Sequence, residues 1–241
     1  MIAAVPAGYS AADLHIHTRF SDGRPSPRAV LSHVKAAGRP DIVAITDHNT
    51  ITGALQAAAL APEFGVTVIV GEEVSSVAGH ILGLFLQERV PPGLTPQATL
   101  AAIHAQGGIA VAPHPFYQAR RPRRPTELPT MESIGSLAAA LPFDAIEVVN
   151  GTPFLGRANL RARRFNQTQV RRAETGASDA HILDAIGKGY TLFPGETAAD
   201  LRLALLNGAT AARLRSYHRG ELLHYLQFWL RLSLARRAPA W

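Results

Sequence analysis

Short apolar runs of β-strand length recur along the 241-residue chain, and segments with helix-like punctuation separate them. Runs of this kind, apolar at consecutive positions, are typical of strands buried on both faces of a sheet. Strands that alternate with helices of about 10 to 15 residues indicate a parallel sheet. We expect strands before His15, at 41–46, 66–70, 80–86, 109–112 and 144–149, and a last strand at 190–193.

Capping residues mark where the helices begin and end. Ser26-Pro27 and Thr95-Pro96 each combine an N-cap side chain with a proline in the first turn. Gly38 and Gly107 are suited to end these two helices, because glycine readily adopts the left-handed conformation of a helix end. The other predicted helices cover 52–60, 130–141, 156–174, 197–207 and 222–234, and the Pro- and Arg-rich segment 118–129 is expected to be a loop.

Imidazole and carboxylate side chains accompany most of these strands. Side chains alternate along a strand, so His15 and His17 face one point, as do Asp179 and His181. A (β/α) barrel concentrates its chemistry at the carboxyl ends of its strands, whereas a doubly wound sheet gathers ligands at one crevice, usually beside a glycine-rich phosphate loop. No such loop is evident in this sequence. The pattern therefore favours a single α/β domain over 1–241 with an irregular barrel.

The composition narrows the chemistry. A hydrophobic content of 47% supports a substantial core, and the absence of cysteine excludes disulfides and thiolate-bound zinc, so any metal must be held by His, Asp and Glu. We see neither a signal-peptide pattern nor about 18 consecutive apolar residues, and expect a cytoplasmic enzyme. The net charge of +6 is almost wholly due to arginine. It reflects either genome composition or a preference for anionic partners, phosphorylated metabolites or nucleic acid.

Each candidate metal ligand has a competing interpretation. His48 follows a buried strand, while Asp47 beside it should point the other way and support a ligand rather than be one. Glu73 is preferred over Glu72, which is expected to be solvated or to support the site. Asp22 could also serve the turn geometry of Asp-Gly. The candidate set is His15, His17, Asp22, His48, Glu73, His80, His114, Asp179 and His181.

The motifs that carry these residues resemble those of a known family. In order, they are DLHIHTRFSDG, AITDHNT, GEEVSS, GHILGLF, APHPF, DAIEVVNG and SDAH. The set is similar to the polymerase-and-histidinol-phosphatase (PHP) family of metal-dependent phosphoesterases, over about 12–206. The resemblance implies a distorted seven-stranded (β/α) barrel of the TIM-like type with two or three metal ions, followed here by a helical extension over about 209–241. All nine positions of the family's ligand pattern are filled by the candidate set.

The resemblance also implies roles. His15, His17, Glu73 and Asp179 would hold one metal, Glu73 would bridge to a second held with His80 and His114, and Asp22, His48 and His181 would hold the third. Mixed imidazole and carboxylate ligands suit Mn²⁺, Fe²⁺ or Zn²⁺. The expected reaction is hydrolysis of the phosphate ester of a small metabolite or nucleotide by a hydroxide that bridges the metals. Asp47, His48 and His181 are candidate catalytic residues, and Arg19, Arg120 and Asn150 are candidate substrate contacts.

Two other enzyme classes and the role of the C-terminus stay open. A nuclease or nucleic-acid-processing activity on short oligonucleotides would use the arginines, although the sequence carries no known nucleic-acid motif. An amidohydrolase barrel commonly needs a strand-end lysine, but Lys35 lies in a predicted helix and Lys188 in a predicted turn. The apolar segment 222–234 is too short to span a bilayer, and we expect it to pack on the barrel, to form a homodimer contact or to lie on a membrane surface.

Overall fold

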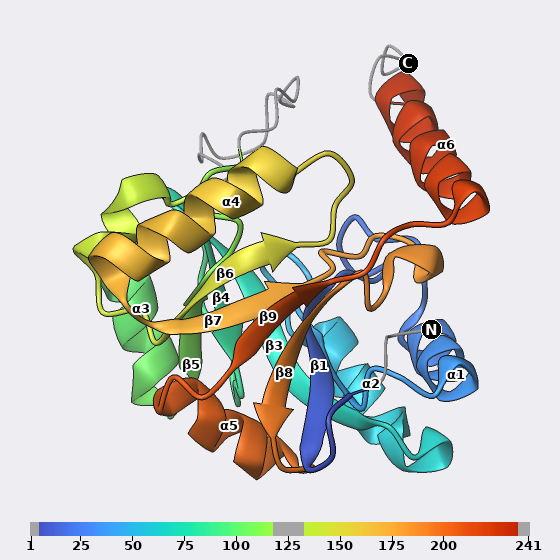
Figure 1. The fold of residues 1–241 in the computed structure, drawn as a ribbon, viewed down its shortest axis with the longest axis horizontal. Helices are drawn as coiled ribbons and strands as arrows, with labels where there is room; N and C mark the ends of the chain where they lie inside the picture. Colours follow the sequence, from blue (N-terminus) through green and yellow to red (C-terminus); the bar gives the residue numbers. More distant parts are fainter. Residues whose placement is uncertain (1–4, 118–132, 236–241) are drawn as a thin grey trace.

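The sheet dominates the computed structural model, which describes residues 5–117 and 133–235, with side chains described up to residue 231. Within this part of the chain, nine strands form one sheet that curls into a nearly closed barrel (Figure 1). The strands are β1 (Tyr9–Ile16), β2 (Ile42–Ile45), β3 (Thr67–Ser76), β4 (Gly79–Leu84), β5 (Ile109–Ala112), β6 (Ala145–Asn150), β7 (Ala173–Ala177), β8 (Gly189–Pro194) and β9 (Ala211–Leu214). The α/β barrel expected from the sequence is confirmed, with two strands, β7 and β9, that were not predicted.

The sheet is mixed, so the expectation of an all-parallel sheet is wrong. The strand order is β7-β6-β5-β4-β3-β2-β1-β8-β9. Strands β1 to β3 run parallel, as do β5 to β7, but β4 is antiparallel to both of its neighbours and β8 is antiparallel to β1 and β9. Only residues 77 and 78 lie between β3 and β4. A link of two residues can close a hairpin, but a parallel crossover needs a dozen or more residues.

The barrel closes along a seam between β7 and the pair β1 and β8. Ile16 forms an isolated parallel bridge with Ala180, just beyond the end of β7. The hydroxyl of Thr191 on β8 donates to the Gly176 carbonyl at 2.8 Å and accepts from its N–H at 3.0 Å. A Cβ at Gly189 would overlap the Ala177 carbonyl. Glycine thus permits the close backbone approach that completes the barrel.

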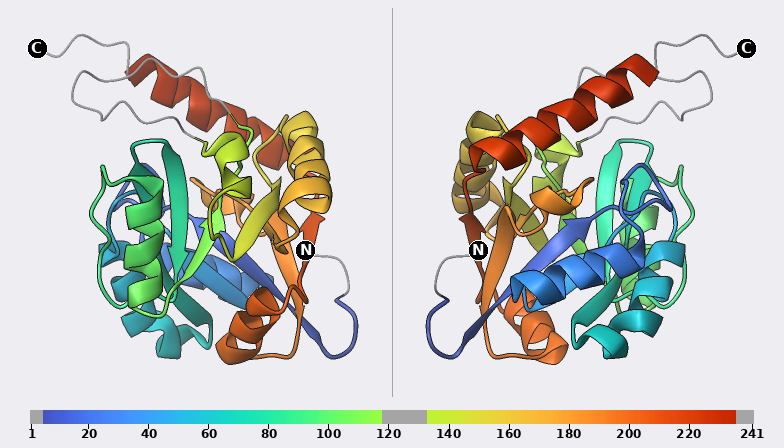
Figure 2. Two further views of the ribbon diagram at one scale, coloured as in Figure 1. Left: turned by 90° about the vertical axis from the view of Figure 1, so that its left-hand side faces the viewer. Right: turned by 90° about the vertical axis from the view of Figure 1, so that its right-hand side faces the viewer.

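The helices cover the outside and both ends of the barrel (Figures 1 and 2). Leu14, Ile42, Leu82 and Val111 form a core inside the barrel with Leu201, which belongs to the helix at the lower end of the barrel in Figure 1. The helices are α1 (Pro27–Ala37), α2 (Thr52–Phe64), α3 (Pro96–Ala105), α4 (Gly156–Phe165), α5 (Ala198–Leu206) and α6 (Arg219–Ala235). Short turns of other helix types are η1 (Gly135–Ala139), the π-helical η2 (Asn166–Val170) and η3 (Leu183–Ala185).

The predicted N-caps of α1, α3 and α5 are present, but Thr52, also predicted as a cap, is the first residue of α2, and three helix predictions need correction. Ser26, Thr95 and Thr197 cap α1, α3 and α5 through side-chain hydrogen bonds. Helix α2 begins at residue 52 and continues to Phe64, beyond the predicted end at 60. The helix expected over 156–174 ends in η2, because Arg171 adopts a left-handed conformation (φ 56°) and β7 follows. Within the described part of 130–141, only the 3₁₀ turn η1 is helical.

Helix α6 crosses the end of the barrel where β1 and β2 finish (Figure 2). Lys188 holds its start: this buried ammonium donates to the carboxylate of Glu221 and lies 4.6 Å from the centre of the Tyr217 ring. Tyr225 and Phe228 of α6 are buried. The helix therefore packs on the barrel, as expected. Across the described residues, no helix is long and apolar enough to cross a membrane.

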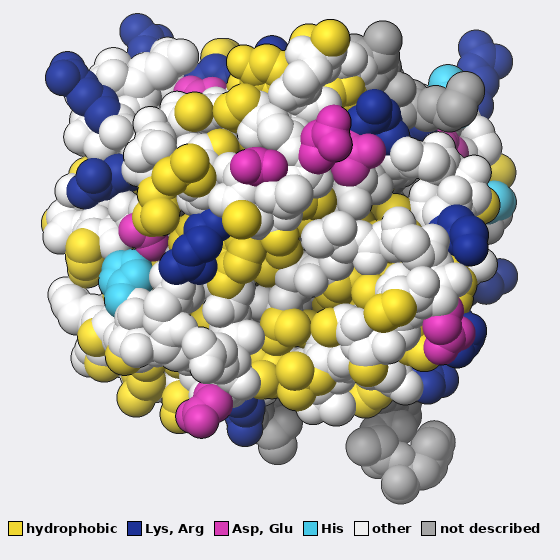
Figure 3. All heavy atoms as spheres, turned by 90° about the horizontal axis from the view of Figure 1, so that it is seen from below, with side chains coloured by type: hydrophobic (Ala, Val, Ile, Leu, Met, Phe, Trp, Pro, Cys, Tyr) yellow, Lys and Arg dark blue, Asp and Glu magenta, His cyan; other side chains and the backbone are white. Residues whose placement is uncertain are grey.

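The opposite end of the barrel has a different surface. Figure 3, which views the molecule of Figure 1 from below, shows charged side chains of both signs scattered between apolar ones. No histidine cluster is visible on this face. The candidate ligand His181 lies at the other end of the barrel, where it contacts Phe228 and Trp229 of α6.

Candidate metal centre

Strand β1 delivers two fully buried histidines to the end of the barrel. Its pairing with β2 shifts between Asp13 and Ile16. Such an irregularity changes which face successive side chains occupy. As a result Leu14 joins the core inside the barrel while His15 and His17 both reach the polar cluster. The prediction that these two histidines face one point is confirmed, since their ring centres are 5.0 Å apart.

The turn after β1 folds back and brings Asp22 to the same place. Asp47 organises this turn: it accepts hydrogen bonds from the N–H and the hydroxyl of Thr18 and from the hydroxyl of Ser21, each at 2.7 Å. A Cβ at Gly23 would overlap the His17 carbonyl, so the turn requires glycine there. Asp47 therefore positions the loop that carries Asp22, in agreement with the predicted supporting role.

Glu73, in the middle of β3, lies at the centre of the cluster. Its backbone forms an isolated bridge with His48, at the end of β2. Its carboxylate oxygens lie 3.0–3.3 Å from ring nitrogens of five histidines: His15, His17, His48, His80 and His114. Glu72 points the other way and accepts a hydrogen bond from the N–H of Val90 at 2.8 Å. It is fully buried, so the alternative that Glu72 is solvated is wrong.

Two residues with a strained backbone, one after β5 and one after β7, complete the cluster. His114 and Asp179 have positive φ values of 27° and 53°. Such conformations are costly for residues other than glycine and gather at functional sites. Asp179 and His181 do not lie on a regular strand, as their spacing predicts, but in the segment after β7. Both nevertheless reach the cluster: Asp179 Oδ1 is 3.3 Å from His17 Nε2, and His181 Nε2 is 3.1 Å from Asp22 Oδ1.

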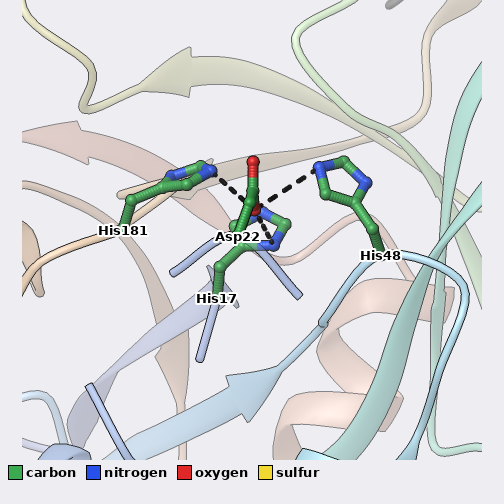
Figure 4. A group of neighbouring side chains, drawn as sticks. All are labelled: His17, Asp22, His48 and His181. Atoms are coloured by element: carbon green, nitrogen blue, oxygen red, sulfur yellow. Dashed lines mark ion pairs between the residues drawn. The ribbon is translucent and has the colours of Figure 1, made fainter. Parts of the chain in front are cut away.

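All nine candidate ligands converge. They form four overlapping groups in which potential ligand atoms lie within 4.8 Å of one another. In the group drawn in Figure 4, the rings of His17, His48 and His181 surround the carboxylate of Asp22. The other groups are His15 with His114 and Asp179, His15 with His17 and Glu73, and His48 with Glu73 and His80. His15, His17, His48 and Glu73 each belong to two groups, so neighbouring groups share ligand residues.

The donor atoms fit metal ions better than hydrogen bonding. Among the described residues, the buried Nε2 atoms of His15, His17 and His181 make no hydrogen bond, although carboxylate oxygens lie 3.1–3.6 Å away. Buried polar atoms without hydrogen bonds are uncommon and indicate a bound ion or another functional role. The cavity between the side chains has a volume of about 20 Å³, which suits ions and water but not an organic ligand. These observations fit divalent metals.

The charges in the cluster compensate one another. Burial lowers the pKa of His17, but the carboxylates of Asp179 and Glu73 outweigh burial and raise this pKa to about 10. Burial raises the pKa of Asp179, yet the surrounding imidazoles hold it well below its usual range. Burial lowers the pKa of His48 to about 3. The carboxylates thus remain ionised in the protein interior, and protons and metal ions compete for the same groups.

Glu147 on β6 is a supporting residue that the sequence analysis missed. Its buried carboxylate lies 3.1 Å from His15 Nδ1 and accepts from the N–H of His114 at 3.1 Å and from the Asn150 amide at 2.8 Å. The same amide donates to Asp179 at 3.2 Å. Histidines that bind metals usually donate their second N–H to such a carboxylate, which fixes the ring and its tautomer. A glutamate inside the apolar run AIEVV was the signal available in the sequence.

Of the three predicted substrate contacts, one is buried, one is exposed and one lies outside the described residues. Asn150 is buried, and its amide is engaged with Glu147 and Asp179. The Arg19 side chain is exposed on the turn after β1. Arg120 lies outside the described residues, as does the arginine-rich segment around it. Tyr117, which was not predicted, lines the cluster cavity, with its ring centre 5.9 Å from that of His114.

Comparison with known proteins agrees with this geometry. Residues 13–126 match the PHP domain family, and residues 156–210 match a PHP-associated family. The uncharacterized protein MJ1587 of Methanocaldococcus jannaschii is 40% identical over 150 residues, which cover 58% of this chain and 81% of that protein. A 3′,5′-nucleoside bisphosphate phosphatase of Chromobacterium violaceum is 40% identical over 83 residues, which cover 33% of this chain and 29% of that protein.

A similar fold occurs in a solved structure. A two-domain protein from Bacteroides vulgatus, which contains a predicted PHP-like metal-dependent phosphoesterase, superposes with a TM-score of 0.68 at 22% identity. The match covers 94% of this chain and 72% of that one. The barrel, the ordered ligand motifs and these relatives lead to one conclusion: the chain belongs to the PHP domain family.

Proposed function

We propose that this PHP protein hydrolyses phosphate esters of small phosphorylated metabolites or nucleotides with two or three divalent metal ions, Mn²⁺, Fe²⁺ or Zn²⁺. The observation that carries the proposal is the convergence of nine imidazole and carboxylate side chains, six of which line a cavity large enough only for ions and water. Mixed nitrogen and oxygen ligands suit these metals. Residues that are not ligands, Asp47 and Glu147, hold the donors in place.

The ligand groups suggest how the ions would be held. Glu73 contacts members of two groups and is suited to bridge two ions. Asp22, His48 and His181, with His17 beside them, would hold a further ion. Divalent ions bound there would neutralise charge on phosphoryl oxygens and lower the pKa of coordinated water from about 15.7 toward 7.

The protein itself contributes position and exclusion of water. The fully buried rings of His15 and His17 form the floor of the site, and Tyr117 lines its cavity. A phosphate ester must therefore approach from the side of α6 and Tyr117. His48 and His181, at this side, are proposed to act in catalysis through the ion that they would hold together with Asp22. Asp47 is committed to three hydrogen bonds in the turn, so we propose that it acts by positioning Asp22.

Two neighbouring glutamates provide a matched test. Metal-stripped protein is reloaded with Mn²⁺, Fe²⁺ or Zn²⁺ and tested on phosphorylated metabolites, nucleotides and short oligonucleotides, with phosphate release as the measurement. We expect Glu73→Gln to lose metal binding and at least about 100-fold of the activity, because an amide is a poor substitute for a bridging carboxylate. Glu72→Gln should keep metal binding and activity, because the Glu72 side chain faces away from the cluster.

The same panel can contradict the proposal. Full activity in metal-stripped protein, or equal activity in the two glutamine variants, would show that the cluster does not carry the reaction. Hydrolysis of oligonucleotides in preference to every small phosphate ester would favour the nuclease alternative instead.

A further inference from the structure

A second cavity lies near the metal cluster but is separate from it. It is bordered by the turn after β1, by η3 and by α6, and is here called the α6 cavity. Its volume is about 440 Å³, within the range of small-molecule sites. Its lining includes Arg24, Pro25, Leu183, Asp184, Phe228 and Arg231. Among the described residues, none lines both cavities, and the reaction proposed above gives the α6 cavity no role.

A wall of main chain and aromatic rings stands between the two cavities. The N–H of Arg24 donates to the His181 carbonyl at 2.9 Å. The ring of His181 packs against the rings of Phe228 and Trp229, with centres 6.1 and 5.8 Å apart. The wall prevents one molecule from reaching into both cavities. A molecule bound in the α6 cavity is therefore a second ligand and not part of the substrate.

The lining of the α6 cavity combines positive charge with apolar surface. Arg24 and Arg231 approach it from the turn and from α6 with exposed side chains, and neither forms an ion pair within the described residues. The carboxylate in the lining, Asp184, lies 2.6 Å from His224 Nδ1. The Arg24 guanidinium also lies 5.3 Å from the centre of the Phe228 ring. A small organic anion with an apolar part complements this lining, because guanidinium groups donate paired hydrogen bonds to anionic oxygens.

The segments that border the α6 cavity also carry metal ligands. Asp22 lies two residues before Arg24 on the turn after β1, and His181 directly precedes Ile182, which lines the cavity. Both ligands belong to the group drawn in Figure 4. A molecule that orders the two segments from the cavity side leaves less to be ordered when an ion binds on the other side. Such coupling is reciprocal and makes each ligand bind more tightly in the presence of the other.

We infer that the α6 cavity is an effector site, which binds a small organic anion with an apolar part and strengthens metal binding by Asp22 and His181. The anionic group contacts Arg24 and Arg231, and the apolar part packs on Phe228. This inference goes beyond the proposed phosphoesterase function, because it concerns a second ligand and not the substrate.

A matched pair of fluorescent dyes tests the binding of the anion. 1-Anilinonaphthalene-8-sulfonate is titrated into metal-stripped protein, and N-phenyl-1-naphthylamine has the same rings without the sulfonate. Arg24→Gln and Arg231→Gln should each raise the Kd of the sulfonate dye roughly tenfold, as expected for the loss of one charge-assisted hydrogen bond, and should leave the Kd of the neutral dye nearly unchanged. Arg172→Gln is the control, because this exposed arginine precedes β7 and lies at the other end of the barrel.

Metal ions test the effector role. Zn²⁺ is the suitable ion, because its filled d shell does not quench the dye. Saturating Zn²⁺ should lower the Kd of the sulfonate dye about fivefold. Calorimetric titration with Zn²⁺ should show a gain in metal affinity of about the same factor when the sulfonate dye is present, since the coupling is reciprocal.

Three results would overturn the inference. The first is a Kd of the sulfonate dye that is the same in wild type and in both arginine variants. The second is an equal rise in the Kd of the neutral dye, which would show that the substitutions disturb α6. The third is an affinity for the sulfonate dye that does not change with Zn²⁺.

The dye titration also separates this inference from the proposed function. Binding to metal-stripped protein is measured without turnover. If the sulfonate dye binds as expected and the metal-loaded protein hydrolyses no phosphate ester, only the proposed function fails. If the protein is an active phosphoesterase and the sulfonate dye does not bind, only the effector site is refuted.

Discussion

Replacing Glu147 with glutamine or alanine would separate folding from metal binding. The two oxygens of this buried carboxylate have different partners. Oε1 accepts from the N–H of His114 at 3.1 Å and from the Asn150 amide at 2.8 Å, and Oε2 lies 3.1 Å from His15 Nδ1. The opposite nitrogen of that ring, Nε2, faces Glu73 and Asp179 in the cluster. Glu147 therefore keeps the proton on Nδ1 and leaves Nε2 free to bind a metal.

The expected magnitudes follow from these partners. Glu147→Ala would leave three buried donors without this acceptor, at about 1–3 kcal/mol each, so we expect it to lower the free energy of unfolding by roughly 3–9 kcal/mol. Glu147→Gln keeps an oxygen for His114 and Asn150, but its NH₂ group then faces His15 Nδ1. That nitrogen must become the acceptor, and the proton moves to Nε2. We expect near-normal stability and a metal affinity about 10- to 100-fold lower.

Two measurements check this prediction. Thermal unfolding of the metal-free variants gives the stability, and calorimetric titration with Mn²⁺ gives the affinity and the number of ions. Glu72→Gln is the control, because this buried carboxylate accepts from a backbone N–H and faces away from the cluster. Wild-type metal affinity in Glu147→Gln would refute the argument that Glu147 sets the tautomer of His15.

Two further predictions concern packing and pH. Gly53→Ala should destabilise the protein by about 1–3 kcal/mol despite the helical preference of alanine, because a Cβ there would overlap the Asp47 carboxylate. Gly156→Ala is the control, because nothing lies within 4 Å of a Cβ at that position. In thermal unfolding this variant should be neutral or more stable by up to about 1 kcal/mol. Burial raises the pKa of Glu221, but Lys188 outweighs burial and lowers it below the unfolded value of about 4.5. The stabilisation of the folded protein by the ionised Glu221 carboxylate is therefore complete above pH 4.5 and is lost as the pH falls. Glu221→Gln should cost about 1–3 kcal/mol at pH 7 and progressively less as the pH falls below 4.5, and a cost that does not decrease with falling pH would contradict this assignment.

The sequence predicts most of the barrel because seven of its strands are strongly apolar. Strands β7 and β9 are different: AETGA and AARL contain no β-branched residue except Thr175 and little apolar surface of their own. Their position depends on tertiary contacts, such as the close approach of Gly176 to Thr191, which no local pattern reports. The antiparallel direction of β4 is likewise set by the two-residue link before it, a length that the predicted boundaries did not resolve.

The candidate ligands could be predicted because each stands in a recognisable local motif, whereas the residues that orient them could not. Asp179 reaches the cluster through a left-handed backbone conformation rather than through strand alternation. Glu147 and Asn150 act across the barrel on His15 and Asp179, which are distant in the sequence. Lys188 acquires its surroundings only when α6 packs over the barrel.

The pairing of β1 with β8 has a consequence for how the protein matures. Tyr9 lies opposite Pro194, so β1 stays without its second neighbour until translation has passed residue 194. Asp179 and His181 also emerge late, and a nascent chain before that point offers incoming ions only partial sets of donors. Pairings between such distant segments form slowly. The ions available where and when synthesis finishes, rather than those met during it, should therefore decide which metals the protein acquires.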